Sequence, residues 1–308
     1  MRIAFLNLCH TDPEMVARVA NKLTKHPDFD MYIHVDAKSD IEPFQRLLQN
    51  NKQVFFLKER HKVYWGGYHA ILASFALLEA ALKSERHYDY VVMLQNLDYP
   101  IKSNAYIDKF FEDNNGTEYI RGCHIAETRD WHYAAKYKIY NSRDKDFYLQ
   151  KHNKLVKLAW DAFHALMSIT TIGFNGIHKE NGENLELYYG TAQWAVTRTC
   201  AEYMVEFFYT HPKFNKRMKH IKFPDEEYFH TVVHNSKYKT HCVKFDEPEQ
   251  RWLVNWRNIH YFEFPDEGVR TFTEEDYEKI MQLDELFIRK TRTGISDKLL
   301  DAIDEATK

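Results

Sequence analysis

The sequence lacks several features on which whole classes of protein depend. Its four cysteines are too few and too scattered for a disulfide framework, and the absence of a CxxC pair argues against a structural zinc site. No apolar run approaches the roughly 18 to 20 residues of a membrane span. The N-terminal apolar run at residues 3–8 is shorter than the core of a signal peptide. We therefore expect a soluble, cytoplasmic protein without a transmembrane segment.

A strong net charge and the common phosphate-binding patterns are also lacking. The chain has 42 Lys and Arg against 45 Asp and Glu, a formal net charge of −3, so no net attraction draws it to nucleic acid. Neither GxGxxG nor GxxxxGK[ST] occurs, which argues against a dinucleotide oxidoreductase or a P-loop enzyme. The 44% hydrophobic content is enough for a globular core, and the 15% aromatic content suits the faces of sugar rings. We expect no nucleic-acid partner.

The N-terminal third contains an alternation of short apolar runs and helical patterns. The apolar runs lie at residues 2–8, 31–35, 54–57 and 90–94. Asp12-Pro13-Glu14 marks the start of one helix, and Trp65-Gly66-Gly67 precedes an apolar stripe that indicates another. This β-α-β-α-β order predicts a doubly wound α/β fold with a mostly parallel central sheet flanked by helices.

The remainder of the chain is less regular and contains no internal repeat and no linker-like segment. Residues 119–186 are rich in Tyr, His and Lys. The pattern after them predicts a strand at 188–197, helices at 200–208 and up to about 233, and a helix at 273–281 that begins with a capping box. We therefore expect one continuous domain over residues 1–308.

Ligands of such a sheet bind beyond the carboxyl ends of its strands. The positions that directly follow the predicted strands are 9–10, 36, 65–67, 95–98 and 190–194. These positions are the first candidates for a site.

A second group of candidates lies near residue 226. In the run 224–227 (Pro-Asp-Glu-Glu) the carboxylates can cap a helix, or one of them can act as a general base. His230 and His234 share a helix face with Glu226, so a zinc hydrolase is an alternative. However, Thr231 stands where a zinc protease needs Glu.

A metal-dependent nucleotide-sugar transferase would carry a D-x-D pattern at the end of an apolar strand. Here the run at 90–94 leads to Asn96-Leu97-Asp98, and a single acid is a poor clamp for a divalent cation. A sugar transferase with this sequence would need cationic side chains to neutralise the departing diphosphate. The available cations near the C-terminus are Arg251, Arg257, Arg270, Arg289 and Lys290.

Seven stretches of the chain, taken in order, resemble one family. They are residues 3–13, 33–39 (Ile-His-Val-Asp-Ala-Lys-Ser), 63–67 (Val-Tyr-Trp-Gly-Gly), 97–104 (Leu-Asp-Tyr-Pro-Ile-Lys-Ser-Asn), 190–194 (Gly-Thr-Ala-Gln-Trp), 224–226 and 286–290 (Leu-Phe-Ile-Arg-Lys). This order resembles the core-2/I-branching β-1,6-N-acetylglucosaminyltransferase family, which includes the peptide O-xylosyltransferases. The chain departs from that pattern at Gln95-Asn96, where small residues are usual. It lacks the membrane anchor and disulfides of the eukaryotic members, so it looks like a bacterial relative.

The resemblance implies a GT-A-type fold and an inverting, metal-independent transfer from a UDP-sugar. Glu226 then corresponds to the general base. Lys290 and Arg257 correspond to the groups that hold the diphosphate, with Arg270 as a rival to Arg257, and Asp36 corresponds to a nucleoside contact. GlcNAc is the sugar that the resemblance favours, and xylose and glucuronate are alternatives. Residues 1–115 would form the nucleotide-binding half, and residues 116–308 the acceptor-binding and catalytic half.

Other residues are candidates with less support from the motifs. For the nucleotide sugar they are His10, Trp65 and Asp98, and for the acceptor they are Glu118, Trp131, Lys136 and Trp194. The expected partners are a UDP-sugar and a glycan or glycolipid, with peripheral membrane association through a lipid-linked acceptor. We expect no cofactor and no metal. A carbohydrate-binding protein that keeps the fold without catalysis is the alternative from another class.

Overall fold

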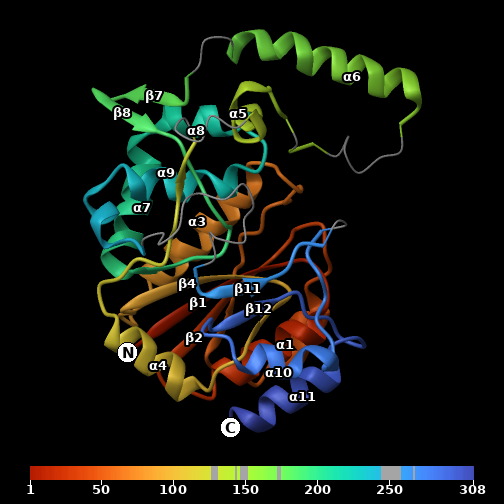
Figure 1. Ribbon diagram of the computed structural model, residues 1–308, viewed down its shortest axis with the longest axis vertical. Coiled ribbons are helices and arrows are strands. Elements are labelled where there is room, and N and C mark those ends of the chain that lie inside the picture. The colour runs from red at the N-terminus through yellow and green to blue at the C-terminus, as the bar shows by residue number, and fades with distance from the viewer. Residues whose placement is uncertain (126–130, 143, 146–151, 172–174, 244–257, 266–267) are drawn as a thin grey trace.

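A five-stranded sheet forms the centre of the computed structural model, which describes all residues except 126–130, 143, 146–151, 172–174, 244–257 and 266–267 (Figure 1). The N-terminal elements are β1 (Ile3–Cys9), α1 (Pro13–Leu23), β2 (Phe29–Val35), α2 (Glu42–Leu48), β3 (Val54–Phe56), α3 (His69–Leu82) and β4 (Tyr90–Gln95). The strand order is β10-β4-β1-β2-β3, in which only β10 (Ala195–Thr197) is antiparallel to its neighbour. The predicted doubly wound, mostly parallel sheet is confirmed.

The alternation of side chains along each strand divides the core into two parts. In β1, Ala4 and Leu6 join the hydrophobic cluster under α3, whereas Ile3 and Phe5 join the cluster on the opposite face with α1. Both faces of the sheet are therefore covered, which explains why β1 and β4 are nearly unbroken apolar runs.

A smaller sheet lies against the α1 side of the central sheet. It has the order β11-β12-β5, with β11 (His260–Phe262) parallel to β12 (Phe287–Arg289) and β5 (Asp98–Pro100) antiparallel to β12. The helices α4 (Asn104–Asp113), α10 (Tyr277–Met281) and α11 (Asp297–Ala306) contribute to the same hydrophobic cluster. This sheet brings the C-terminal residues 287–290 beside β5, which follows directly after β4.

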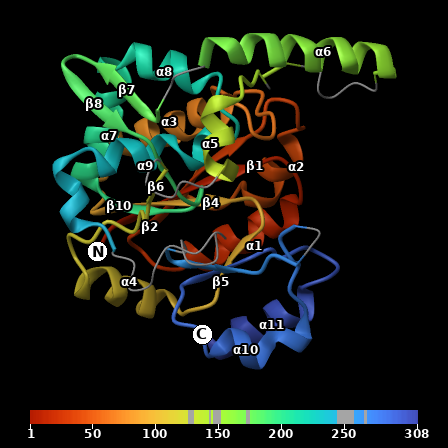
Figure 2. The ribbon, with the colours of Figure 1, turned by 45° about the horizontal axis from the view of Figure 1, so that its top comes forward.

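The segment between β5 and β11 builds the other end of the molecule (Figures 1 and 2). Its elements are β6 (Cys123–His124), α5 (Trp131–Lys138), α6 (Lys154–Met167), η2 (Ser168–Thr171), β7 (Ile177–Glu180), β8 (Glu183–Glu186), β9 (Tyr188–Tyr189), α7 (Arg198–Thr210), α8 (Pro212–Met218), η3 (Pro224–Glu226), α9 (Tyr228–His234) and η4 (Lys237–His241). A further turn, η6 (Glu274–Asp276), carries the predicted capping box between Thr273 and Asp276 and leads into α10.

The single strand predicted at 188–197 is wrong. The chain instead forms β9, which pairs with β6, and then β10, which pairs with β4. The break falls at Gly190, where an added Cβ would lie 2.1 Å from Nε2 of His230 and 2.5 Å from the carbonyl oxygen of Arg121. Only glycine fits this close approach, so the strand pattern is interrupted for a packing reason.

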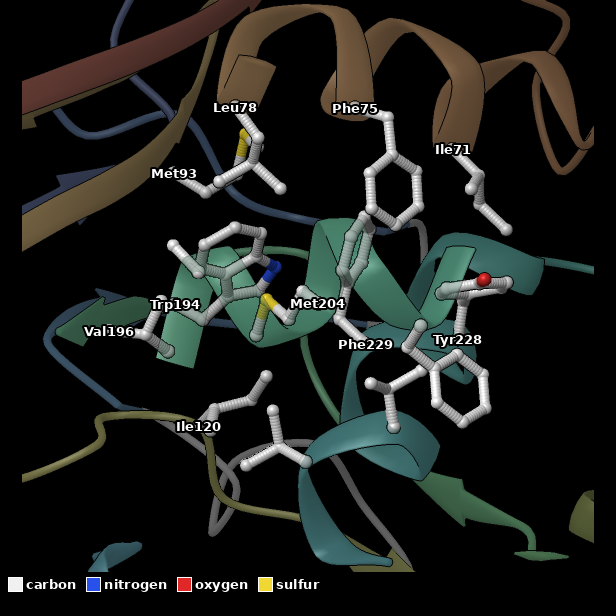
Figure 3. Packing of buried hydrophobic residues seen from close by; sticks show 14 of the residues in the cluster. Ile71, Phe75, Leu78, Met93, Ile120, Trp194, Val196, Met204, Tyr228 and Phe229 are labelled. Atoms are coloured by element: carbon white, nitrogen blue, oxygen red, sulfur yellow. The ribbon is translucent and has the colours of Figure 1, made fainter. Parts of the chain in front are cut away.

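Trp194 lies in the core and not in a binding site. Its side chain is fully buried, with its ring centroid 5.1 Å from that of Phe229 on α9. Figure 3 shows the indole between Met93, Leu78 of α3 and Met204 of α7. The expectation that Trp194 contacts an acceptor is therefore corrected.

A candidate active site at the strand ends

A cleft of about 1180 Å³ opens where β1, β2 and β4 end. The crossover after β1 runs to β2, whereas β4 lies on the other side of β1, so the cleft sits at the switch point of the sheet. Its walls come from segments far apart in the sequence. The predicted site residues that line it are His10, Asp36, Trp65, Lys136, Glu226 and Lys290.

His10 and Asp36 follow β1 and β2 directly. The Asp36 carboxylate accepts the backbone N–H of Lys38 at 2.8 Å and pairs with the Lys38 ammonium at 2.5 Å. The backbone N–H of Asp36 donates to the carbonyl of Cys9 at 2.8 Å, which joins the two strand ends. Burial lowers the pKa of His10, although Asp36 acts in the opposite direction. One wall of the cleft thus carries the imidazole of His10 beside the carboxylate of Asp36, which Lys38 holds in place.

Asn96 accounts for the departure from the D-x-D pattern after β4. Its side-chain oxygen accepts the backbone N–H groups of His10 at 2.6 Å and Thr11 at 2.8 Å, and its amide donates to the Thr11 carbonyl at 2.6 Å. A carboxylate could not make the last of these bonds because it has no donor. Asn96 therefore fixes the turn after β1.

Glu226 lies at the end of η3 on the opposite wall. Its carboxylate accepts a short hydrogen bond from the hydroxyl of Tyr189 and lies 3.3 Å from the ammonium of Lys136. The ammonium also lies 3.7 Å from the centre of the Tyr189 ring. The backbone carbonyl of Glu226 accepts the N–H of Gly190 at 2.8 Å. These contacts hold the carboxylate in place while 23% of the side chain stays exposed to the cleft.

The two acids beside Glu226 have different surroundings. Desolvation and the neighbouring Glu226 raise the pKa of Asp225 to about 7. Burial raises the pKa of Glu227 to about 8, and within the described chain neither oxygen of its fully buried carboxyl group has a hydrogen-bond partner. Of the three adjacent acids, only Glu226 combines exposure to the cleft with a salt bridge to Lys136.

We expect the substitution Glu227→Gln to flatten the pH dependence of stability. Because the folded-state pKa of Glu227 is about 8, the folded protein keeps a proton that the unfolded chain releases. The free energy of unfolding therefore falls between about pH 5 and 8, with a slope of up to about 1.4 kcal/mol per pH unit. Glutamine cannot ionise, so the variant lacks the contribution of residue 227 to this fall in the free energy of unfolding. Urea unfolding of both proteins at several pH values measures the difference, and equal slopes would contradict it.

The third wall carries two adjacent cations, Arg289 and Lys290, at the end of β12. Asp98 pairs with Arg289 in the ladder between β5 and β12, and its carboxylate lies 2.8 Å from the Arg289 guanidinium and 3.3 Å from His260. Burial alone would raise the pKa of Asp98, but Arg289 and His260 hold it below its usual value. Asp98 is buried and does not line the cleft, so it positions Arg289.

Lys290 lies within the cleft, and none of the described acids forms an ion pair with its ammonium. Desolvation lowers its pKa, and the nearby charges of Arg289 and Arg292 lower it further. A bound anion would relieve this repulsion between like charges. Arg270, the rival of Arg257, instead pairs with Glu263 at 3.0 Å and Asp276 at 2.7 Å and does not line the cleft.

The remaining candidates lie elsewhere or outside the described residues. Glu118 is buried and accepts the backbone N–H and the hydroxyl of Thr197 at 2.8 and 2.6 Å, so it supports the start of α7 and does not reach the cleft. Trp131 is the first residue of α5, and its side chain is not described. Arg257 lies outside the described residues. Trp65, by contrast, lines the cleft; it is 76% exposed, with its ring edge-on to that of Phe223 at 4.7 Å between centroids.

The histidines that suggested a zinc hydrolase do not converge with Glu226. His234 places Nε2 2.9 Å from the carbonyl of Ile120, and burial lowers its pKa to about 4. His230 is fully buried against Gly190. Among the described residues, no three His, Cys, Asp or Glu side chains form a group that could hold a metal ion.

Of the residues of the site, Tyr189 was missed in the sequence, and Arg289 was named only among the available cations and not chosen for the site. Tyr189 bonds to Glu226, and Arg289 stands beside Lys290. The signal for Arg289 was present, since it precedes Lys290 in the 286–290 motif. Tyr189 adjoins the glycine of the 190–194 motif, but nothing in the sequence aims its hydroxyl at Glu226.

Comparisons with known proteins identify a family and two relatives. A family model described as "Core-2/I-Branching enzyme" matches residues 3–281. Xylosyltransferase oxt of Drosophila melanogaster is 23% identical over 328 aligned residues, which cover 99% of this chain and 33% of the relative. Xylosyltransferase oxt of Drosophila pseudoobscura pseudoobscura is 25% identical over 272 residues, covering 83% of this chain and 26% of the relative. The chain spans about a third or less of the length of these curated relatives.

Proposed function

The chain belongs to the Core-2/I-branching enzyme family, and we propose that it transfers a sugar from a UDP-sugar to a hydroxyl of a glycan or glycolipid acceptor. The central, mostly parallel sheet is that of a GT-A-type fold. One observation carries the proposal. Glu226, which is paired with Lys136, and the adjacent cations Arg289 and Lys290 face the same cleft, together with the strand-end residues His10 and Asp36.

The reaction needs a base and a stabilised leaving group. A sugar hydroxyl is a weak nucleophile at neutral pH, so a carboxylate must accept its proton while its oxygen attacks the anomeric carbon. In our proposal, Glu226 takes that proton as the bond between the anomeric carbon and the UDP oxygen breaks. A single displacement of this kind inverts the configuration at that carbon.

The departing UDP gains negative charge, which Arg289 and Lys290 are placed to stabilise. Fixed cations that face the developing charge lower the barrier without the cost of reorganising solvent. Arg289 is oriented for this role by its ion pair with Asp98. Arg257 stays a proposal from the family motif. We propose that these cations replace a metal ion, since Asn96 stands at the first D-x-D position and Asp98 is committed to Arg289.

Two observations bear on the identity of the donor sugar: the sequence motifs and the names of the curated relatives. The motifs favour UDP-GlcNAc, and both curated relatives are named xylosyltransferases, which makes UDP-xylose the second candidate. A panel with UDP-GlcNAc, UDP-xylose and UDP-glucuronate, read out as release of free UDP, tests the choice. Slow release from one of them is the expected result, and release from none would favour a carbohydrate-binding protein.

The same assay tests metal independence. We expect UDP release to survive EDTA, because the carboxylate that would clamp a cation, Asp98, is buried in an ion pair with Arg289. Loss of most of the activity in the chelator, with recovery on adding Mn²⁺, would contradict this expectation.

A further inference from the structure

The helix α6 presents an apolar face to solvent. Leu155, Leu158 and Leu166 of α6 are 77, 66 and 63% exposed, Ile169 of the following turn η2 is 58% exposed, and α6 has no buried residue. The three leucines are three and eight residues apart, which places them on one side of a helix of 3.6 residues per turn. Helices of soluble proteins normally turn such a face towards the core, so an exposed one marks an interaction surface.

The opposite side of α6 is the one that contacts the protein. The ring of Tyr140 lies 6.0 Å from His164 and 6.3 Å from Phe163, and the His164 ring nitrogen lies 3.1 Å from the Ser142 hydroxyl. His164 and Tyr140 also line the cleft. The inner side of α6 therefore borders the candidate active site, while its leucines point outwards.

The basic residues around α6 indicate which kind of partner the leucine face would bind. Residues 131–171 and 211–222 together contain twelve Lys or Arg and three Asp, in a chain whose formal net charge is −3. Of these, Lys154 and Lys157 lie on α6 and are exposed, as are Lys213 and Lys216 on α8. The helices α6 and α8 lie at the same end of the molecule, opposite the end that carries α10 and α11 (Figures 1 and 2).

We propose that α6 docks the protein on an anionic lipid surface, with its leucine face at the level of the acyl chains and its lysines near the headgroups. An amphipathic helix with apolar and basic side chains binds such an interface in two ways: its apolar side chains are buried among the acyl chains, and its basic side chains are attracted to the anionic headgroups. A second copy of the chain packed on the same face fits less well, because it would bring Lys154 and Lys157 of both copies together.

Docking in this way would place the cleft next to the membrane. Since α6 contributes His164 to the cleft, a hydroxyl carried on a lipid-linked glycan would enter beside the docked helix. The docking surface does not depend on the identity of the donor or on turnover, so its failure and the failure of the proposed transferase function are distinguishable.

The test is co-sedimentation with vesicles of phosphatidylglycerol mixed with phosphatidylcholine, compared with vesicles of phosphatidylcholine alone. The double variant Leu158→Gln/Leu166→Gln should lower the partition into the anionic vesicles by about tenfold or more, since two apolar side chains leave the interface. Each of Lys154→Gln and Lys157→Gln should lower it by up to about fivefold at low salt. Added salt should weaken binding of the wild-type protein.

A matched control is the double variant Leu47→Gln/Ile295→Gln. These side chains are 42 and 51% exposed and lie outside α6, so the control should bind vesicles like the wild type. Far-UV circular dichroism and thermal unfolding of all variants show whether they are folded. The proposal is overturned if the wild type ignores the anionic vesicles, if it binds both vesicle types equally, or if the α6 variant binds as well as the control. It is also overturned if α6 substitutions only convert a soluble dimer into a monomer.

Discussion

Glu226→Gln is expected to lower the turnover number by about a hundredfold or more, which is the usual scale for the loss of a general base. The amide keeps the size of the side chain, and its oxygen can still accept the hydrogen bond from Tyr189. It cannot, however, take a proton from the acceptor hydroxyl. UDP affinity should change little, because the proposed diphosphate contacts come from Arg289 and Lys290 on another wall of the cleft. Initial rates at saturating donor and calorimetric titration with UDP measure the two quantities.

The matched control is the same change one residue later, Glu227→Gln. The carboxyl group of Glu227 is fully buried and does not line the cleft, and its pKa is raised to about 8. It is therefore largely protonated at neutral pH and cannot serve as a base there. We expect this variant to keep most of its turnover. A Glu226→Gln protein with near-normal turnover, or the reverse order of the two effects, would refute the mechanism.

The fold was accessible from the sequence because local patterns determine most of it. In β1 and β4 the apolar runs are buried on both faces, and Asp12 caps α1 as the Asp-Pro-Glu pattern predicted. The residues that directly follow β1 and β2, His10 and Asp36, were placed in the cleft by the same logic. The end of a strand is thus predictable where a long apolar run stops at a polar residue.

The contacts that complete the site depend on pairings between distant segments. Asp98 meets Arg289, 191 residues away, only because β5 pairs with β12. From the sequence alone, Asp98 could equally contact the ligand itself. Glu118 and Trp194 show the same limit, since an acid or an aromatic residue near a motif can serve the core as well as a site. Burial separates these roles, and burial follows from the tertiary packing.

The irregular middle of the chain was underestimated for a different reason. Residues 119–186 were expected to be less regular, yet they contain α5 and the 14-residue helix α6. The helical spacing of leucines at 155, 158 and 166 was available in the sequence as a signal. Asn153 also caps α6 by accepting the backbone N–H of Val156. The spacing of these leucines is the same whether they face the core or solvent, so it predicts the helix but not the exposure of its apolar side.

Lys290→Ala is expected to weaken UDP binding by about ten- to a hundredfold, which corresponds to the roughly 1.5 to 3 kcal/mol of a hydrogen bond to a charged group. Desolvation and the charges of Arg289 and Arg292 lower the pKa of Lys290, so the cleft holds a cation whose charge is opposed by its surroundings. The diphosphate would offset that repulsion when it binds. Titration calorimetry with UDP, in the absence of acceptor, isolates this effect from catalysis.

Arg270→Ala serves as the matched control, because it removes one positive charge from the same region of the chain. The Arg270 guanidinium is held by Glu263 and Asp276 and does not line the cleft, so its loss should leave UDP affinity close to that of the wild type. The variant should instead lower stability, since the Arg270 side chain is 37% exposed but its partners Glu263 and Asp276 are only 22% and 7% exposed. Unchanged UDP affinity in Lys290→Ala would remove Lys290 from the site. A larger loss in Arg270→Ala than in Lys290→Ala would show that the diphosphate lies nearer Arg270, and that the cleft must rearrange when UDP binds.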